Sequence, residues 1–92
     1  MDMLKGKVLA VQVSKKEPQN LIVAFEVKRE VRLQDQSFTE THIYSLKMNN
    51  TDKPNVGDTY LAEGKIWELD VGLKGMTNVN LTKLPEVKYA KS

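Results

Sequence analysis

Cysteine is absent from the 92 residues of this chain, and histidine occurs once. Without thiols the protein cannot form disulfides, thiolate zinc sites, redox motifs or a cysteine nucleophile. Small domains often gain stability from a disulfide, a metal or a second subunit, and because the first is excluded we expect a homodimer. The lack of cysteine also fits a reducing compartment, so we expect a cytoplasmic protein.

Long apolar runs are missing as well. None approaches the roughly 20 residues that a membrane-spanning helix needs. Residues 1–7 lead into an alternating segment without the apolar core of a signal peptide. These absences predict a soluble protein that is not exported and has no membrane partner.

Motifs for catalysis and metal binding are also lacking. The single histidine, His42, has no second histidine or cysteine at metal-ligand spacing, and no nucleophile motif accompanies it. Gly72 and Gly75 are too close together for a dinucleotide or phosphate loop. Glu30 and Glu40 can face each other across a hairpin, but strand carboxylates are usually solvated. We therefore predict a non-enzymatic protein without a metal, cofactor or small-molecule substrate.

Alternation of apolar and polar side chains dominates what is present. It is clearest from Leu21 to Leu33, where six apolar residues share one face of a strand. Arg29 interrupts that face: it reaches solvent, pairs with a carboxylate, or marks a bulge or bend, and we favour the last. Similar but shorter alternation predicts four more strands, at Leu4–Val13, Phe38–Met48, Thr59–Leu69 and Thr77–Leu84.

Five strands and no helical periodicity predict an all-β fold, a small five-stranded antiparallel barrel that is OB-like. A chain of this length supports one core and is too short for a standard two-sheet sandwich. We expect residues 1–85 to form this single domain and residues 86–92 to form a flexible C-terminal tail.

Charge is unevenly distributed, although the net charge is only +2. Residues 1–33 carry seven basic and four acidic side chains, residues 34–70 three and seven, and residues 71–92 four and one. If the two ends of the chain pair in the fold, they form one basic face opposite an acidic one. A solvated surface without a binding role explains the same charges equally well.

Basic and aromatic residues are interleaved on the predicted strands, which is the arrangement that single-strand binders use to contact phosphates and stack on bases. Phe38 and Tyr44 share a face with apolar residues, so core packing is the favoured interpretation for both. Trp67 fits a core and a surface position equally well. The candidate nucleic-acid-binding residues are Lys5, Lys7, Lys28, Arg32, Tyr44, Lys47, Lys65, Trp67 and Lys74.

The second half of the chain resembles the helix-destabilising, single-stranded-DNA-binding proteins of filamentous phages. The spacing of four segments carries the resemblance: Tyr44–Met48, Val56–Tyr60, Val71–Gly75 and Val79–Pro85. The resemblance implies an OB-type barrel, a homodimer and cooperative coating of newly made single strands. One departure is that Leu73 or Lys74 stands where that family tends to carry an aromatic residue in a loop.

Two functions are therefore expected. The first is sequence-tolerant binding of single-stranded DNA, or of RNA, during phage or plasmid replication, without catalysis. The alternative is a small β-barrel that binds another protein or serves as a phage structural module, without nucleic-acid binding; the acidic middle of the chain favours this second function.

Overall fold

The computed structural model describes residues 1–85, and these form five β-strands joined by loops and turns. The predicted tail, residues 86–92, lies outside the described residues. No helix in the described part of the chain could cross a membrane. The strands are β1 (Asp2–Val13), β2 (Asn20–Leu33), β3 (Gln36–Asn49), β4 (Thr59–Glu68) and β5 (Lys74–Lys83).

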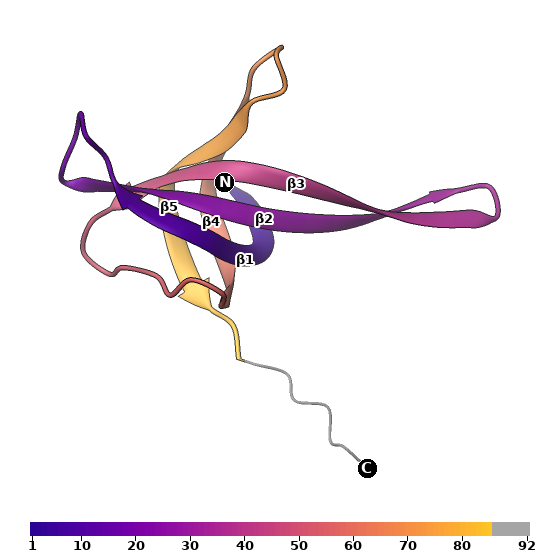
Figure 1. Ribbon diagram of the computed structural model, residues 1–92, viewed down its shortest axis with the longest axis horizontal. Helices are drawn as coiled ribbons and strands as arrows, with labels where there is room; N and C mark the ends of the chain where they lie inside the picture. Colours follow the sequence, from indigo (N-terminus) through magenta and orange to yellow (C-terminus); the bar gives the residue numbers. More distant parts are fainter. Residues whose placement is uncertain (86–92) are drawn as a thin grey trace.

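The strands close into a ring in the order β1-β2-β3-β5-β4, with β4 pairing back to β1 (Figure 1). Every pairing is antiparallel except that of β3 with β5, which is parallel. The all-β, OB-like architecture that alternation predicted is therefore confirmed, with one parallel contact in the ring. Within residues 1–85, β1 pairs with β2 and β4 and not with β5, so the pairing on which a joint basic face of the two ends depended is not present in the described strands.

Strand β1 can pair with two neighbouring strands because it bends. Its first half pairs with β4 and its second half with β2, and the register shifts between Val8 and Ala10. Gly6 lies close against β2, since a Cβ atom added there would lie 2.3 Å from the backbone oxygen of Glu26 and 2.8 Å from a ring carbon of Phe25. The missing side chain thus permits the closure of the ring at this point.

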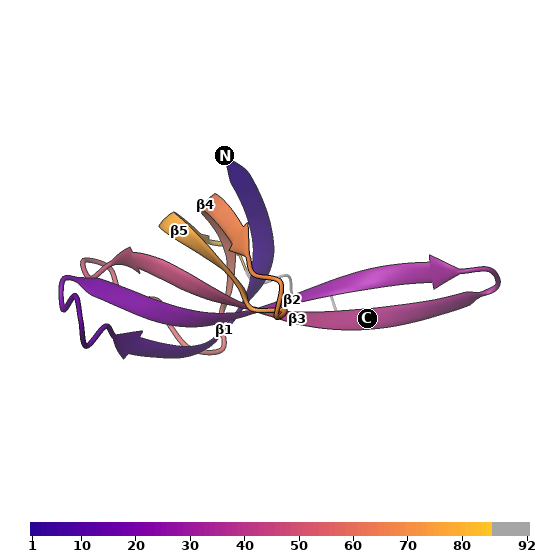
Figure 2. The same cartoon turned by 90° about the horizontal axis from the view of Figure 1, so that it is seen from above.

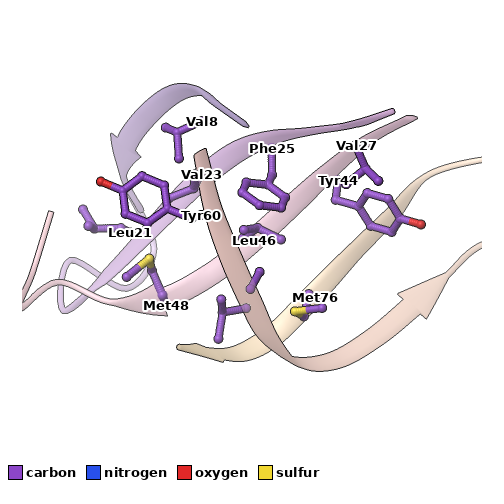
Figure 3. Close-up of a cluster of buried hydrophobic side chains, with 12 residues drawn as sticks. Val8, Leu21, Val23, Phe25, Val27, Tyr44, Leu46, Met48, Tyr60 and Met76 are labelled. Carbon is purple, nitrogen blue, oxygen red and sulfur yellow. The ribbon is translucent and has the colours of Figure 1, made fainter. Parts of the chain in front are cut away.

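The core consists of the inward-facing side chains of all five strands (Figure 3). The apolar face predicted for Leu21–Leu33 supplies its centre, and Tyr44 joins it at 6% exposure, as the packing interpretation predicted. Its buried members are Val8, Leu21, Val23, Phe25, Val27, Tyr44, Leu46, Met48, Tyr60, Ala62, Met76 and Val79.

Beyond Val27, strands β2 and β3 leave the ring and project as a two-stranded arm, residues 28–41, which extends to one side in Figures 1 and 2. The pairing of β2 with β3 continues to Leu33 and Gln36 without a register shift, so of the two features favoured at Arg29, a bulge or a bend, the bulge is wrong. Arg29 is exposed because its part of the strand has no core beneath it. For the same reason Phe38 is 47% exposed, and its predicted place in the core is also wrong.

Strand β5 begins at Lys74, three residues before the predicted start at Thr77. Gly75 lies within this strand, opposite Trp67 of β4. Gly72 does occupy the turn, with a φ of 91° that favours glycine. A second irregularity follows at Asn78, where φ is 54° and the pairing of β4 with β5 shifts between Glu63 and Lys65.

Candidate nucleic-acid interface

An open groove of about 520 Å³ lies on the outer face of strands β1, β2 and β3. Its floor is built from outward-facing residues that pair across the three strands: Ala10 lies opposite Ala24, and Ala24 lies opposite Ser45. Because these side chains are small, the sheet leaves room for a ligand there. Ile22 and Ile43 add apolar surface to the groove, and Ile43 is 48% exposed.

The β4–β5 loop forms one wall of this groove through Gly72, Leu73 and Lys74. Lys74 is fixed in position because its Nζ donates a hydrogen bond to His42 Nδ1 at 2.6 Å. The same ammonium lies 5.6 Å from the centre of the Tyr44 ring, within the range of a cation–π contact. The fold therefore directs a cation to the groove wall, held by an imidazole and an aromatic ring.

His42 is held in turn by Glu40. Its Nε2 lies 3.4 Å from Glu40 Oε1, so a neutral imidazole accepts from Lys74 at Nδ1 and donates to the carboxylate from Nε2. His42 thus positions the ammonium of Lys74.

Three of the predicted cations project from the same outer face as the groove. Lys28 and Lys47 belong to the outward-facing residues of β2 and β3, and Lys7 occupies the corresponding face of β1, opposite Glu26. Lys7 and Lys28 are exposed, whereas Lys47 is half-buried. The acidic Glu26 lies on the same face, so the net positive charge of this face is moderate.

Lys47 is engaged by the β1–β2 loop, because its Nζ forms an ion pair with Glu17. The hydrogen bond and the charge of Lys47 together lower the pKa of the Glu17 carboxyl below its ordinary value. The loop is ordered around this pair: the backbone N–H of Glu17 donates to Ser14 Oγ, and the backbone N–H of Asn20 donates to the Glu17 carbonyl.

Trp67 is half-buried on the outer side of β4, and its ring covers Gly75 of β5. A Cβ atom at Gly75 would lie 2.5 Å from Trp67 Cζ2, so the indole can pack here only because Gly75 has no side chain. Gly75 is also the parallel partner of Ser45, a floor residue of the groove. Trp67 therefore lies two strands away from the groove floor, on the same outer surface.

The predicted residues are thus divided among several places. Tyr44 and Lys74 line the groove, although the Tyr44 ring is too buried to stack on a base. Arg32 lies on the projecting arm. Lys5 is exposed on β1 where it pairs with β4, and Lys65 is exposed on β4 beside Trp67.

The sequence interpretation missed the groove floor. Ile22 and Ala24 share the outward face of β2 with the charged residues Glu26 and Lys28, and the nearby Ile43 is apolar on the outward face of β3. Apolar side chains on a face otherwise charged were the available signal. Within residues 1–85 there is no cluster of metal-ligating side chains. No family model, curated protein or solved structure matches this chain, so its function is inferred from the geometry of this surface.

Proposed function

We propose that the protein binds single-stranded nucleic acid, with single-stranded DNA as the first candidate, along the outer face of β1, β2 and β3. The observation that carries the proposal is the groove on that face, with an apolar floor and lysines at its edges. In OB-folds the face of strands 2 and 3, together with the loops after strands 1 and 4, is the surface that binds oligonucleotides.

Each part of the surface supports one component of single-strand binding. The lysines supply phosphate contacts, which give affinity without sequence information. The floor at Ile22, Ala24 and Ile43 accommodates the apolar faces of bases, while Trp67 offers the one indole for stacking. Binding of this kind is sequence-tolerant and needs no catalytic group.

The proposed role is the coating of single-stranded DNA during phage or plasmid replication, by a cytoplasmic homodimer. Support for this role comes from the resemblance to phage helix-destabilising proteins together with the OB-like strand order.

A titration of Trp67 fluorescence with oligo(dT), at low and at high salt, tests the proposal. Trp67 is the sole tryptophan, so the signal comes from one position, on β4, two strands away from the groove floor. We expect quenching at low salt and an association constant that falls with salt, at a slope of about −0.7 per phosphate contact. An absence of both quenching and a polarisation change at low salt would contradict the proposal.

A second candidate function is binding to another protein, and the apolar surface of the arm favours it. Leu33 and Phe38, both on the arm, are 58% and 47% exposed. Exposed apolar groups gathered on one element are typical of interaction sites. Copurification of one protein at equal stoichiometry, unchanged by nuclease, would favour this function over the first.

A further inference from the structure

His42 and its two hydrogen-bond partners belong to a group of charges that cancel one another. At the base of the arm, Arg29 of β2 lies opposite Glu40 of β3, and in the ring Glu68 of β4 lies opposite Lys74 of β5. While the imidazole is neutral these four charges sum to zero, and protonation of His42 makes the sum positive. The attraction of this group for an anion therefore depends on one proton.

We propose that His42 and Lys74 together bind one backbone phosphate of the strand in the groove, and that His42 takes up a proton as the phosphate binds; this inference rests on the function proposed above. Both residues line the groove.

The ammonium of Lys74 contacts only uncharged partners in the unbound protein. Its Nζ donates to His42 Nδ1 at 2.6 Å and lies 5.6 Å from the centre of the Tyr44 ring. Among residues 1–85 no carboxylate forms an ion pair with Lys74, whereas Lys47 is paired with Glu17. The charge of Lys74 is thus left for an anion that enters the groove.

Protonation changes the hydrogen bonds that His42 can make. Neutral His42 accepts from Lys74 at Nδ1, while its Nε2 lies 3.4 Å from Glu40 Oε1. A protonated imidazole has two donors and no acceptor, so Lys74 must release Nδ1. A phosphate oxygen between the two cations accepts from both His42 Nδ1 and Lys74 Nζ, and the added proton comes from the solvent. Glu40 remains at Nε2 and stabilises the imidazolium.

Phosphate binding and protonation favour each other. An anion beside His42 stabilises the imidazolium, and by reciprocity the imidazolium strengthens binding of the anion. Histidine is the side chain whose charge ordinarily changes between about pH 5 and about pH 8, and His42 is the single histidine of the chain. Neither thymine nor a phosphodiester changes its charge in that range. Affinity for oligo(dT) should therefore rise as the pH falls through it.

Oligo(dT) affinities of the full chain at about pH 5.5 and about pH 8, each at several salt concentrations, test the proposal. His42→Gln keeps an acceptor for Lys74 but removes the titrating group. Glu17→Gln is the matched control, since it removes a titrating group that contacts a different lysine, Lys47. Circular dichroism verifies folding at both pH values. An NMR titration of the His42 ring in the wild type, with and without oligo(dT), supplies a measurement that needs no variant.

We expect the wild type and Glu17→Gln to bind at least about fivefold more tightly at the lower pH. Their salt slopes should be steeper there by about 0.7, the value for one more phosphate contact. In His42→Gln both differences should disappear, and in the wild type oligo(dT) should raise the pH at which His42 titrates.

Three results overturn the inference and leave the groove intact: a wild type whose affinity and salt slope do not change with pH, a pH dependence that persists in His42→Gln, or a titration of His42 that oligo(dT) does not shift. A wild type that binds oligo(dT) at neither pH overturns both proposals.

Discussion

The contact between Gly75 and Trp67 shows how a single hydrogen atom in place of a side chain shapes the outer surface. The indole lies over the backbone of β5 because nothing projects from Gly75. The same added Cβ atom would also lie 2.3 Å from the backbone oxygen of Ser45 on β3. Any added carbon atom must therefore displace the ring or separate β3 from β5.

We predict that Gly75→Ala destabilises the protein by about 1–3 kcal/mol, the usual cost of forcing an extra carbon into a filled space. Urea unfolding followed by circular dichroism measures the change, and Trp67 emission should shift to longer wavelength as the ring becomes more exposed. Thr82→Ala, on the exposed side of the same strand, is the control and should change little. Equal stability of Gly75→Ala and the wild type would show that the ring is not seated as described.

The ion pair of Glu17 and Lys47 leads to a prediction about pH. Lys47 lowers the pKa of Glu17 in the folded protein, so the carboxylate stabilises the fold above its unfolded-state pKa. This stabilisation disappears as the pH falls through the lowered pKa. Glu17→Gln should be slightly less stable than the wild type at pH 7, and the difference in stability should vanish as the pH falls below the lowered pKa of Glu17.

Urea midpoints at a series of pH values measure this convergence. The effect should be small, since the pair is exposed and exposed ion pairs contribute little. Glu30→Gln on the arm serves as a control for the removal of an exposed carboxylate. A gap between wild type and Glu17→Gln that widens on acidification would contradict the assignment.

The β2–β3 hairpin has two parts, one packed against the core and one exposed to solvent. From Leu21 to Val27 the inward side chains of β2 are buried in the core, whereas residues 28–41 are exposed apart from Val31. A two-stranded hairpin without further packing is at best marginally stable in water. The arm should therefore open locally at a lower free energy than the part within the ring.

Amide hydrogen exchange tests this difference within one pair of strands. We predict protection factors at least about tenfold lower for paired amides between Lys28 and Thr41 than for those between Leu21 and Val27. The comparison is internal, because both regions share the same strands and an uninterrupted register. Equal protection throughout would mean that the arm is covered in solution, as expected if it docks on a second molecule.

Local alternation was sufficient to predict the five strands and their buried face, because a half-buried strand repeats every two residues. It could not predict where the core ends: Phe38 and Arg29 continue the inward parity of β3 and β2, yet no strand lies beneath them. The start of β5 was missed because a glycine in a strand, needed for the close approach to Trp67, has the same sequence signature as a turn.

The candidate site was predicted less completely than the strands. The outward parity of the central hairpin placed Lys28 and Lys47 on one face, since parity follows from local sequence. Lys7 shares that face because the register of β1 shifts between Val8 and Ala10, which local parity does not reveal. The groove itself depends on which strands are neighbours and on the position of the β4–β5 loop, and local patterns contain neither. The contact between His42 and Lys74 joins residues far apart in the chain and could not be anticipated.

At the scale of the whole molecule, the closed ring separates the core from a single continuous outer surface. Every strand contributes inward residues to one core, and the outward residues of β1, β2 and β3 remain available for binding. Long-range attraction to a polyanion depends on where the lysines lie on that surface, because the net charge of +2 is small. The location of a charge should therefore matter more than its number.

Two charge reversals of equal size separate the effect of where a lysine lies from the effect of the net charge. Lys28 lies on the outward face of β2, while Lys53 is exposed in the β3–β4 loop, away from the groove lining. Lys28→Glu should weaken oligo(dT) binding and reduce the slope of log affinity against log salt by about 0.7, the value for one lost phosphate contact on a single strand. Lys53→Glu changes the net charge identically but should leave the slope unchanged. Equal reductions in both variants would indicate a diffuse response to net charge, whereas the predicted difference would locate the strand on the outer face of β2.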